Sequence, residues 1–113
     1  MATEGNLWAA AMESGKLERV EHQTGKVTEC TPLTGDSGPF AVDVDTKRNL
    51  VWFSELFTGK IGRFDASKNS FVEFPAPNSD LGVRRIEVDP KHPNRVWWSE
   101  SSSDKIGYLE VLE

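Results

Sequence analysis

A repeated pair of short segments constrains the fold of this chain more than any other feature. Residues 50–65 read as an apolar run that ends in Ser-Glu, then a Thr-Gly turn, then an alternation of basic and apolar residues. The same order returns at 96–109 and, in a more divergent form, at 7–20. Each copy predicts a β-hairpin, because two strand-like runs are separated by turn-forming residues.

The copies are regularly spaced. Trp8, Trp52 and Trp97 are separated by 44 and 45 residues, and the extra residue of the second interval falls in the loop at 90–95. The lysines that begin the second segments keep the same two intervals: Lys16, Lys60 and Lys105. A repeat of this length with four short strand signals is typical of a β-propeller blade, a four-stranded sheet that buries its faces only against neighbouring blades.

The predicted fold is therefore all-β: about two and a half β-propeller-type blades of antiparallel strands, forming an incomplete ring in a single domain. The repeats span 6–38, 39–82 and 83–112. Strand signals number three, four and three, and we expect the innermost strand of the first repeat and the outermost strand of the third to be absent. A ring needs about four blades or more, so we expect self-association or pairing with upstream blades of the same propeller.

Composition and charge exclude several kinds of partner. The formal net charge of −5 disfavours nucleic acid, which is bound by clustered Lys and Arg. No apolar run approaches the ~18 residues of a membrane span, and the first residues carry no signal peptide, so a cytoplasmic protein without a membrane partner is predicted. Cys30 is the single cysteine, which excludes an internal disulfide and favours a strand thiol over a reactive one.

The hairpins also carry a family resemblance. The segments Leu-Val-Trp-Phe-Ser-Glu at 50–55, Gly-Lys-Ile-Gly-Arg-Phe-Asp at 59–65 and Val-Trp-Trp-Ser-Glu at 96–100 resemble blades of the virginiamycin B lyase, or streptogramin lyase, family. The likeness covers nearly the whole chain. It implies a seven-bladed propeller and, in connection with antibiotic resistance, a magnesium-assisted elimination that opens the ester link of a cyclic depsipeptide. A fold of this kind hosts many activities, so the likeness marks fold more firmly than function.

The resemblance implies a set of site residues. In such a site a His takes a proton beside a Mg²⁺ ion that is held by carboxylates. The family's metal-binding Glu on the second strand matches Glu55 and Glu100. Its Glu-Pro-His-Gly loop is not matched, because the His position is Phe40 in one repeat and Arg84 in the next. No catalytic residue is therefore assigned.

Each candidate has a structural interpretation beside the functional one. Glu55 and Glu100 recur from blade to blade, which favours a turn or an ion pair with a repeated lysine over magnesium ligation. Phe40, Arg84 and Arg85 are the candidate ligand-binding residues for a small molecule, because Arg suits bidentate recognition of carboxylates. For the two arginines, ion pairs with neighbouring inner-strand acids are favoured instead: Asp43, Asp45 and Glu87.

The aromatic residues and glycines of the hairpins are interpreted as packing residues. Trp52, Trp97 and Trp98 are large apolar groups on central strands and are expected in the core between blades. Gly62 and Gly107 are expected to let a bulky side chain of the adjacent strand lie close to the backbone.

Two functional hypotheses follow from these observations. The first is a non-catalytic, streptogramin lyase-like blade module that serves binding or assembly. The second is a Mg-dependent carbon–oxygen lyase that opens streptogramin B antibiotics as part of a larger or oligomeric propeller. Neither His22 nor His92 is in register with the family's base, which favours the first hypothesis.

Overall fold

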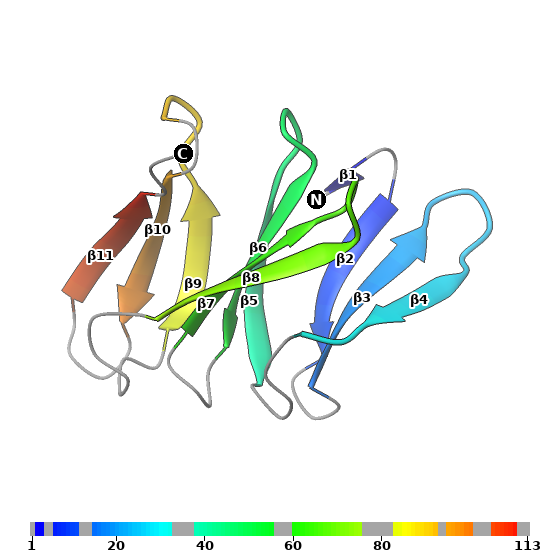
Figure 1. Ribbon diagram of the computed structural model, residues 1–113, viewed down its shortest axis with the longest axis horizontal. Coiled ribbons are helices and arrows are strands. Elements are labelled where there is room, and N and C mark those ends of the chain that lie inside the picture. The colour runs from blue at the N-terminus through cyan, green and yellow to red at the C-terminus, as the bar shows by residue number, and fades with distance from the viewer. Residues whose placement is uncertain are drawn as a thin grey trace.

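The computed structural model describes residues 2–3, 6–11, 15–32, 38–55, 60–75, 83–92, 95–100 and 105–110. These residues form eleven strands in three antiparallel sheets, and they include no helix. The sheets stand side by side as three propeller blades that do not close into a ring (Figure 1). The prediction of an all-β, partial propeller is confirmed. None of the described residues lies in a helix that could cross a membrane.

The first blade contains an innermost strand that the sequence prediction omitted. Its strands in order are β1 (Ala2–Thr3), β2 (Asn6–Ala11), β3 (Lys16–Glu21) and β4 (Val27–Cys30). β1 pairs with the start of β2 through Ala2 with Leu7 and Thr3 with Asn6. The prediction that this strand is absent was wrong, because a strand of two residues is too short to show an alternation of apolar and polar residues.

The second and third blades have the strands that were predicted. The second consists of β5 (Pro39–Asp45), β6 (Leu50–Glu55), β7 (Lys60–Asp65) and β8 (Ser70–Pro75). The third consists of β9 (Val83–Val88), β10 (Arg95–Glu100) and β11 (Lys105–Glu110), with β11 at its edge in the described part of the chain.

In several turns between strands, an aspartate side chain accepts hydrogen bonds from the backbone of the turn. One carboxylate oxygen of Asp45 accepts hydrogen bonds from two backbone N–H groups of the turn that follows, at 3.1 and 3.2 Å. Asp65 and Asp89 do the same at 2.9 to 3.2 Å. After the first two of these aspartates, Asn49 and Asn69 close the turn with φ of 59° and 53°, a left-handed conformation that Asn tolerates. The pattern Asp-x-x-x-Asn thus specifies two of the hairpins.

Each blade has two faces because successive side chains of a strand point to opposite sides of the sheet. We call the face toward the next repeat the leading face and the face toward the preceding repeat the trailing face. On β6, Leu50 and Trp52 lie on the leading face, and Val51 and Phe53 lie on the trailing face. Every residue of β6 is buried, because the second blade has a neighbour on both sides.

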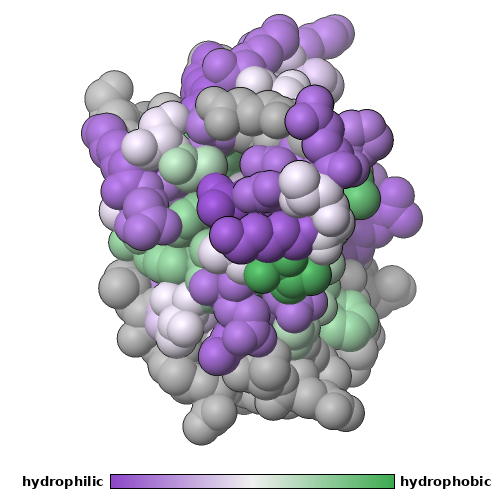
Figure 2. Space-filling model, turned by 90° about the vertical axis from the view of Figure 1, so that its right-hand side faces the viewer, coloured by the Kyte–Doolittle hydropathy of each residue, from purple (hydrophilic) through white to green (hydrophobic). Residues whose placement is uncertain are grey.

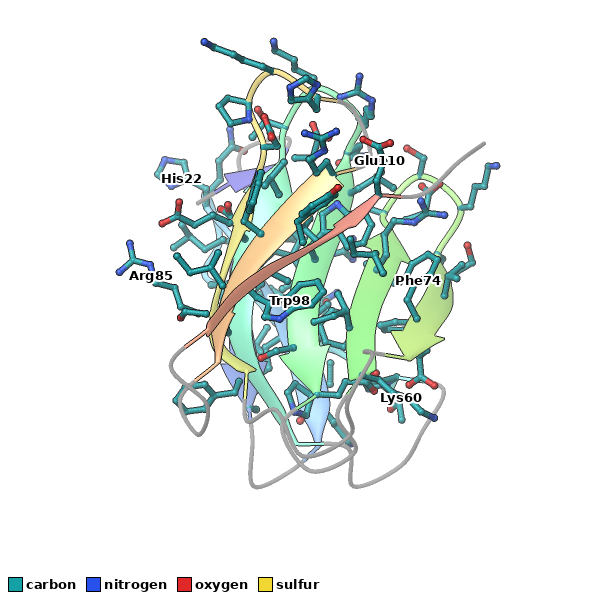
Figure 3. All side chains as sticks on the ribbon, turned by 90° about the vertical axis from the view of Figure 1, so that its left-hand side faces the viewer. His22, Lys60, Phe74, Arg85, Trp98 and Glu110 are labelled. Atoms are coloured by element: carbon teal, nitrogen blue, oxygen red, sulfur yellow. The ribbon has the colours of Figure 1, made fainter. Side chains whose placement is uncertain are left out.

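Two hydrophobic cores fill the two junctions between blades. The core between the first and second blades consists of Trp8, Leu17, Val44, Val51, Phe53 and Phe64. The core between the second and third blades consists of Leu50, Trp52, Ile61, Ile86, Val96 and Trp98. Trp98 lies between β10 and the second blade (Figure 3). The stability of each blade therefore depends on its neighbours, as expected for a propeller.

The prediction that the tryptophans are core residues holds for two of the three. Trp52 and Trp98 are buried at the second junction. Trp97 is 38% exposed, because it lies on the leading face of the third blade, where no further blade follows in the described chain. The predicted role of the glycines is confirmed: a Cβ on Gly62 would lie 2.2 Å from the ring of Phe53, and one on Gly107 would lie 2.7 Å from the ring of Trp98.

Candidate functional site

The residues that the resemblance singles out meet at one end of the second and third blades. β6 and β10 end at Glu55 and Glu100, at the lower edge of Figure 1. Antiparallel pairing places the start of an inner strand beside each of them, with Pro39 opposite Glu55 and Val83 opposite Glu100. Residues 16 and 17 positions apart in sequence are thereby brought to the same end of each blade.

The pairing of the inner strand is irregular at this end in both blades, as at a β-bulge. In the second blade the register shifts between Pro39 and Val42, so that Phe40 and Ala41 lie opposite Ser54. The hydroxyl of Ser54 accepts a hydrogen bond of 3.0 Å from the backbone N–H of Ala41. Bulges are frequent beside binding sites, where they redirect side chains. The sequence contains no glycine at this point that would have indicated the bulge.

The third blade repeats the irregularity at the two arginines. Arg85 pairs with Ser99 and Val83 pairs with Glu100, which leaves Arg84 as the additional residue. Of Arg84 and Glu100 only the backbone is described, so the roles predicted for their side chains lie outside the described residues. The predicted ligand-binding residues Phe40 and Arg84 thus occupy equivalent positions on two consecutive bulges.

Glu55 is buried with 1% of its surface exposed, and it is the one predicted metal ligand whose side chain the structure describes. Mg²⁺ takes near-octahedral coordination by oxygen atoms. The described residues contain no group of three or more His, Cys, Asp or Glu that could hold a metal ion. The lysine opposite Glu55, Lys60, forms an ion pair of 3.6 Å with Glu73 on the outer strand. The donor set of the described residues therefore does not fit a magnesium site.

The structure also locates the other candidate ligand-binding residues. Two guanidinium nitrogens of Arg85 donate to the same carboxylate oxygen of Glu87, at 2.8 and 3.1 Å, which bears out the predicted ion pair. This pair is exposed, and the Arg85 side chain points away from the sheet (Figure 3). Phe40 is partly exposed at the start of β5. The two histidines, His22 after β3 and His92 after β9, are exposed.

A groove follows the inner strands β5 and β9. It is open to solvent, has a volume of about 560 Å³ and is lined mainly by Ala41, Val42, Asp43, Ile86, Glu87 and Val88, together with Arg85 and Pro90. Across this junction the Asp43 carboxylate accepts a hydrogen bond of 2.8 Å from the backbone N–H of Val88. Charges of both signs line the groove, which suits a polar small molecule better than a purely apolar one.

The leading face of the third blade exposes large side chains that were not among the predicted site residues. Trp97, Ile106 and Tyr108 are 38%, 77% and 54% exposed on this face. A hollow of about 190 Å³ opens here, lined by Trp97, Ile106, Trp98, Ser99, Arg85 and Glu87.

Among the described residues, two ionisable groups have clearly shifted pKa values. The indole N–H of Trp97 donates to Asp89 at 2.8 Å and, with the backbone N–H groups of Lys91 and His92, lowers the pKa of that carboxyl group. Burial raises the pKa of the Cys30 thiol, an effect that Arg19 partly opposes. A raised pKa keeps the thiol protonated, which agrees with the prediction of an unreactive strand cysteine.

No family model matches the chain, and no curated protein matches its sequence. Its structure is similar to a solved streptogramin B lyase, with 26% identity and a TM-score of 0.83 over 96% of this chain and 35% of that one. It is also similar to virginiamycin B lyase from Staphylococcus aureus, with 23% identity and a TM-score of 0.75 over 94% of this chain and 38% of that one. A nidogen/laminin complex contains a chain with 19% identity and a TM-score of 0.71 over 93% of this chain and 40% of that one.

These similarities confirm the lyase-like propeller that the hairpin residues indicated. The chain spans between a third and two fifths of the length of each of these structures. It therefore has the fold of a few consecutive blades of such a propeller.

Proposed function

We propose that the chain is a non-catalytic, streptogramin lyase-like blade module that serves binding or assembly through its open blade faces. One observation carries the proposal: the leading face of the third blade exposes the same side chains that the second blade buries. Trp97 and Ile106 are partly or largely exposed, whereas Trp52 and Ile61 at the equivalent positions are fully buried. Exposed apolar patches of this kind mark sites of protein–protein or ligand contact.

The bulge end of the blades supports the non-catalytic part of the proposal. General-base catalysis needs a group within hydrogen-bond reach of the substrate proton. Phe40 and Arg84 occupy the positions of the family's base, and neither side chain accepts a proton near neutral pH. A carboxylate, Glu55, remains at this end without a metal-binding set around it in the described residues.

Fold similarity alone does not decide between catalysis and binding. The solved structures that share these blades include enzymes named as lyases and a protein complex. A free thiol at Cys30 is consistent with the reducing cytoplasm, where we place the module.

The alternative is a Mg-dependent carbon–oxygen lyase for streptogramin B antibiotics, in which the chain supplies part of a larger or oligomeric propeller. In that case further blades would have to bring the general base and most of the metal ligands, with Glu55 as one donor. The two proposals differ in a reaction that can be measured directly.

The test is incubation of the chain with a streptogramin B and Mg²⁺, analysed by chromatography and tandem mass spectrometry. Fragmentation is necessary because an elimination product has the same mass as the cyclic substrate, whereas hydrolysis adds one water. We expect no linear product. Linear product that disappears in Glu55→Gln and on chelation of Mg²⁺ would establish the alternative, and binding of the antibiotic without turnover would identify a ligand of the module.

A further inference from the structure

A groove lies at the outer side of the first junction, between the leading face of the first blade and the trailing face of the second. It is open to solvent, has a volume of about 480 Å³ and is lined mainly by Arg19, Thr28, Cys30, Thr31, Asn69 and Phe71. The outer strand of the first blade, β4, lies at the right of Figure 1. Figure 2 views the molecule from that side and shows mainly hydrophilic side chains with smaller apolar areas.

The pairing of the strands places three of the lining side chains on one wall of the groove. Arg19 of β3 is opposite both Trp8 and Thr28, and Leu17 is opposite Cys30. Trp8 and Leu17 belong to the core of the first junction. Side chains at directly paired positions lie on the same face of a sheet. Arg19, Thr28 and Cys30 therefore all face the second blade.

Cys30 takes the place that a phenylalanine has in the second blade. It pairs with Leu17 on the third strand of its blade, as Phe74 pairs with Ile61. The ring of Phe74 stacks on the ring of Trp52, with centroids 5.9 Å apart. A thiol is much smaller than a phenyl ring. The first blade therefore leaves open the space that a ring fills in the second.

The same difference changes the surroundings of an arginine. In the second blade the guanidinium of Arg63 lies over the rings of Trp52 and Phe74, at 5.5 Å from each. Arg19 is the equivalent arginine, because it is opposite Trp8 as Arg63 is opposite Trp52. Its guanidinium lies over the ring of Trp8 at 5.9 Å. The place of the second ring is taken by the cysteine, so one side of this guanidinium borders the groove.

Arg19 has no ion-pair partner among the described residues. Its Nε–H group is buried and has no hydrogen-bond acceptor in the same part of the chain. Glu29 also borders the groove, but it follows Thr28 on β4, so its side chain lies on the opposite face, where it pairs with Lys16 at 3.4 Å. A buried donor without an acceptor costs free energy, and an anionic ligand would offset that cost.

The rest of the lining suits a carboxylate with an apolar body. Thr28 and Asn69 supply a hydroxyl and an amide, which both donate hydrogen bonds, and Phe71 supplies an aromatic wall. Arginine is suited to bidentate recognition of carboxylates. We propose that the groove binds a small organic acid, with its carboxylate on the Arg19 guanidinium and its apolar part against Phe71. This site does not involve the open blade faces, so the inference goes beyond the proposed function.

The test uses Cys30, the single cysteine, as a reporter in the groove. Iodoacetamide carries no charge and alkylates thiols, and its rate of reaction with the folded chain is measured by mass spectrometry at alkaline pH, where more of the thiol is ionised. We expect benzoate, added at constant ionic strength, to slow the reaction in a saturable manner. Benzamide has the same ring without the charge and should have no effect. Equal protection by both compounds, or protection by neither, would overturn the proposal.

Removing the arginine tests its part in binding. Arg19→Gln should weaken the binding of benzoate about tenfold or more, because hydrogen bonds to charged groups are the stronger ones. Arg95→Gln is the matched control, since it removes the same charge from the third blade, where Arg95 pairs with Glu110 at 2.7 Å. It should leave the protection of the thiol unchanged. Equal protection in Arg19→Gln and in the unmodified chain would show that the guanidinium is not the partner of the carboxylate.

Filling the groove tests its location while the arginine stays in place. Cys30→Phe should place a ring where the second blade has Phe74 and should abolish the binding of benzoate. Binding is followed in this case by the NMR signals of the Arg19 side-chain N–H groups. Cys30→Ala keeps the space and should bind benzoate like the unmodified chain. Retention of binding in Cys30→Phe would place the ligand elsewhere.

Circular dichroism of each variant establishes that its sheets are intact. The antibiotic assay is independent of these measurements. Turnover of a streptogramin would refute the non-catalytic function alone, and a lack of benzoate binding would refute this site alone.

Discussion

The leading faces of the second and third blades carry a tryptophan and an isoleucine at equivalent positions, in different surroundings. Trp52 and Ile61 are completely buried, whereas their equivalents Trp97 and Ile106 are 38% and 77% exposed. Both pairs lie on central or third strands of regular antiparallel sheets with matching register. Burial in a propeller therefore depends on the junction between blades, since equivalent residues become core or surface according to the blade that packs against them.

The indole N–H groups of Trp52 and Trp97 also have different surroundings. The indole N–H of Trp97 donates to Asp89, whereas that of Trp52 has no acceptor among the described groups. Asp45, the equivalent of Asp89, bonds Arg48 instead at 3.2 Å. The guanidinium of Arg63 lies over the rings of Trp52 and Phe74, at 5.5 Å from each. The buried tryptophan is thus stabilised by packing and cation–π contact, and the open one is held by a hydrogen bond.

Replacing each of the two tryptophans with alanine should give the largest difference in stability between equivalent positions of the two blades. Trp52→Ala should reduce the free energy of unfolding by about 3–5 kcal/mol, because it leaves a large cavity in the second junction. Trp97→Ala should cost about 1 kcal/mol in the isolated chain, since part of its surface is already in water. Urea denaturation at concentrations below self-association measures both. Equal losses would contradict the assignment of Trp52, and not Trp97, to the core.

Adding a methyl group to the hairpin glycines should give a smaller effect. Gly62→Ala would force the ring of Phe53 from its fully buried position and should cost about 1–3 kcal/mol. Gly107→Ala should cost less, because β11 is an edge strand in the described chain and can move away from Trp98. Gly25→Ala serves as a control without steric contact, since a Cβ there meets nothing within 4 Å, although its φ of 72° adds backbone strain. A larger loss for Gly107 than for Gly62 would contradict this order.

The smallest expected effect concerns the pKa of Asp89. Its carboxyl has a lowered pKa, so its contribution to stability is present above the unfolded pKa and is lost as the pH falls through the folded pKa. Trp97→Phe removes the indole donor and should raise the pKa of Asp89 toward its ordinary value, as measured by NMR titration of the carboxyl carbon. Trp52→Phe is the control and should leave the pKa of Asp89 unchanged. An unaltered titration in Trp97→Phe would show that the backbone N–H groups alone cause the shift.

Much of the fold and little of the site could be predicted. The tryptophan spacing was sufficient to predict the blades. Their strands could be predicted as well, because alternation over six residues is a strong local signal. The two-residue strand β1 was missed because it has no periodicity to detect. The two bulges were missed because they depend on how the inner strand meets its neighbour, and neither Phe40 nor Arg84 signals a bulge by residue type.

The sequence by itself determined three repeats of one sheet, their hairpin turns and the absence of a histidine where the family has its base. Those properties are local, since each depends on residue types within a few positions of one another. Only the tertiary structure decided which of the equivalent tryptophans is core and which is surface, and that Arg85 pairs with Glu87. The physical reason is that a blade buries its apolar faces against other blades, so the environment of a residue is set by what packs against it.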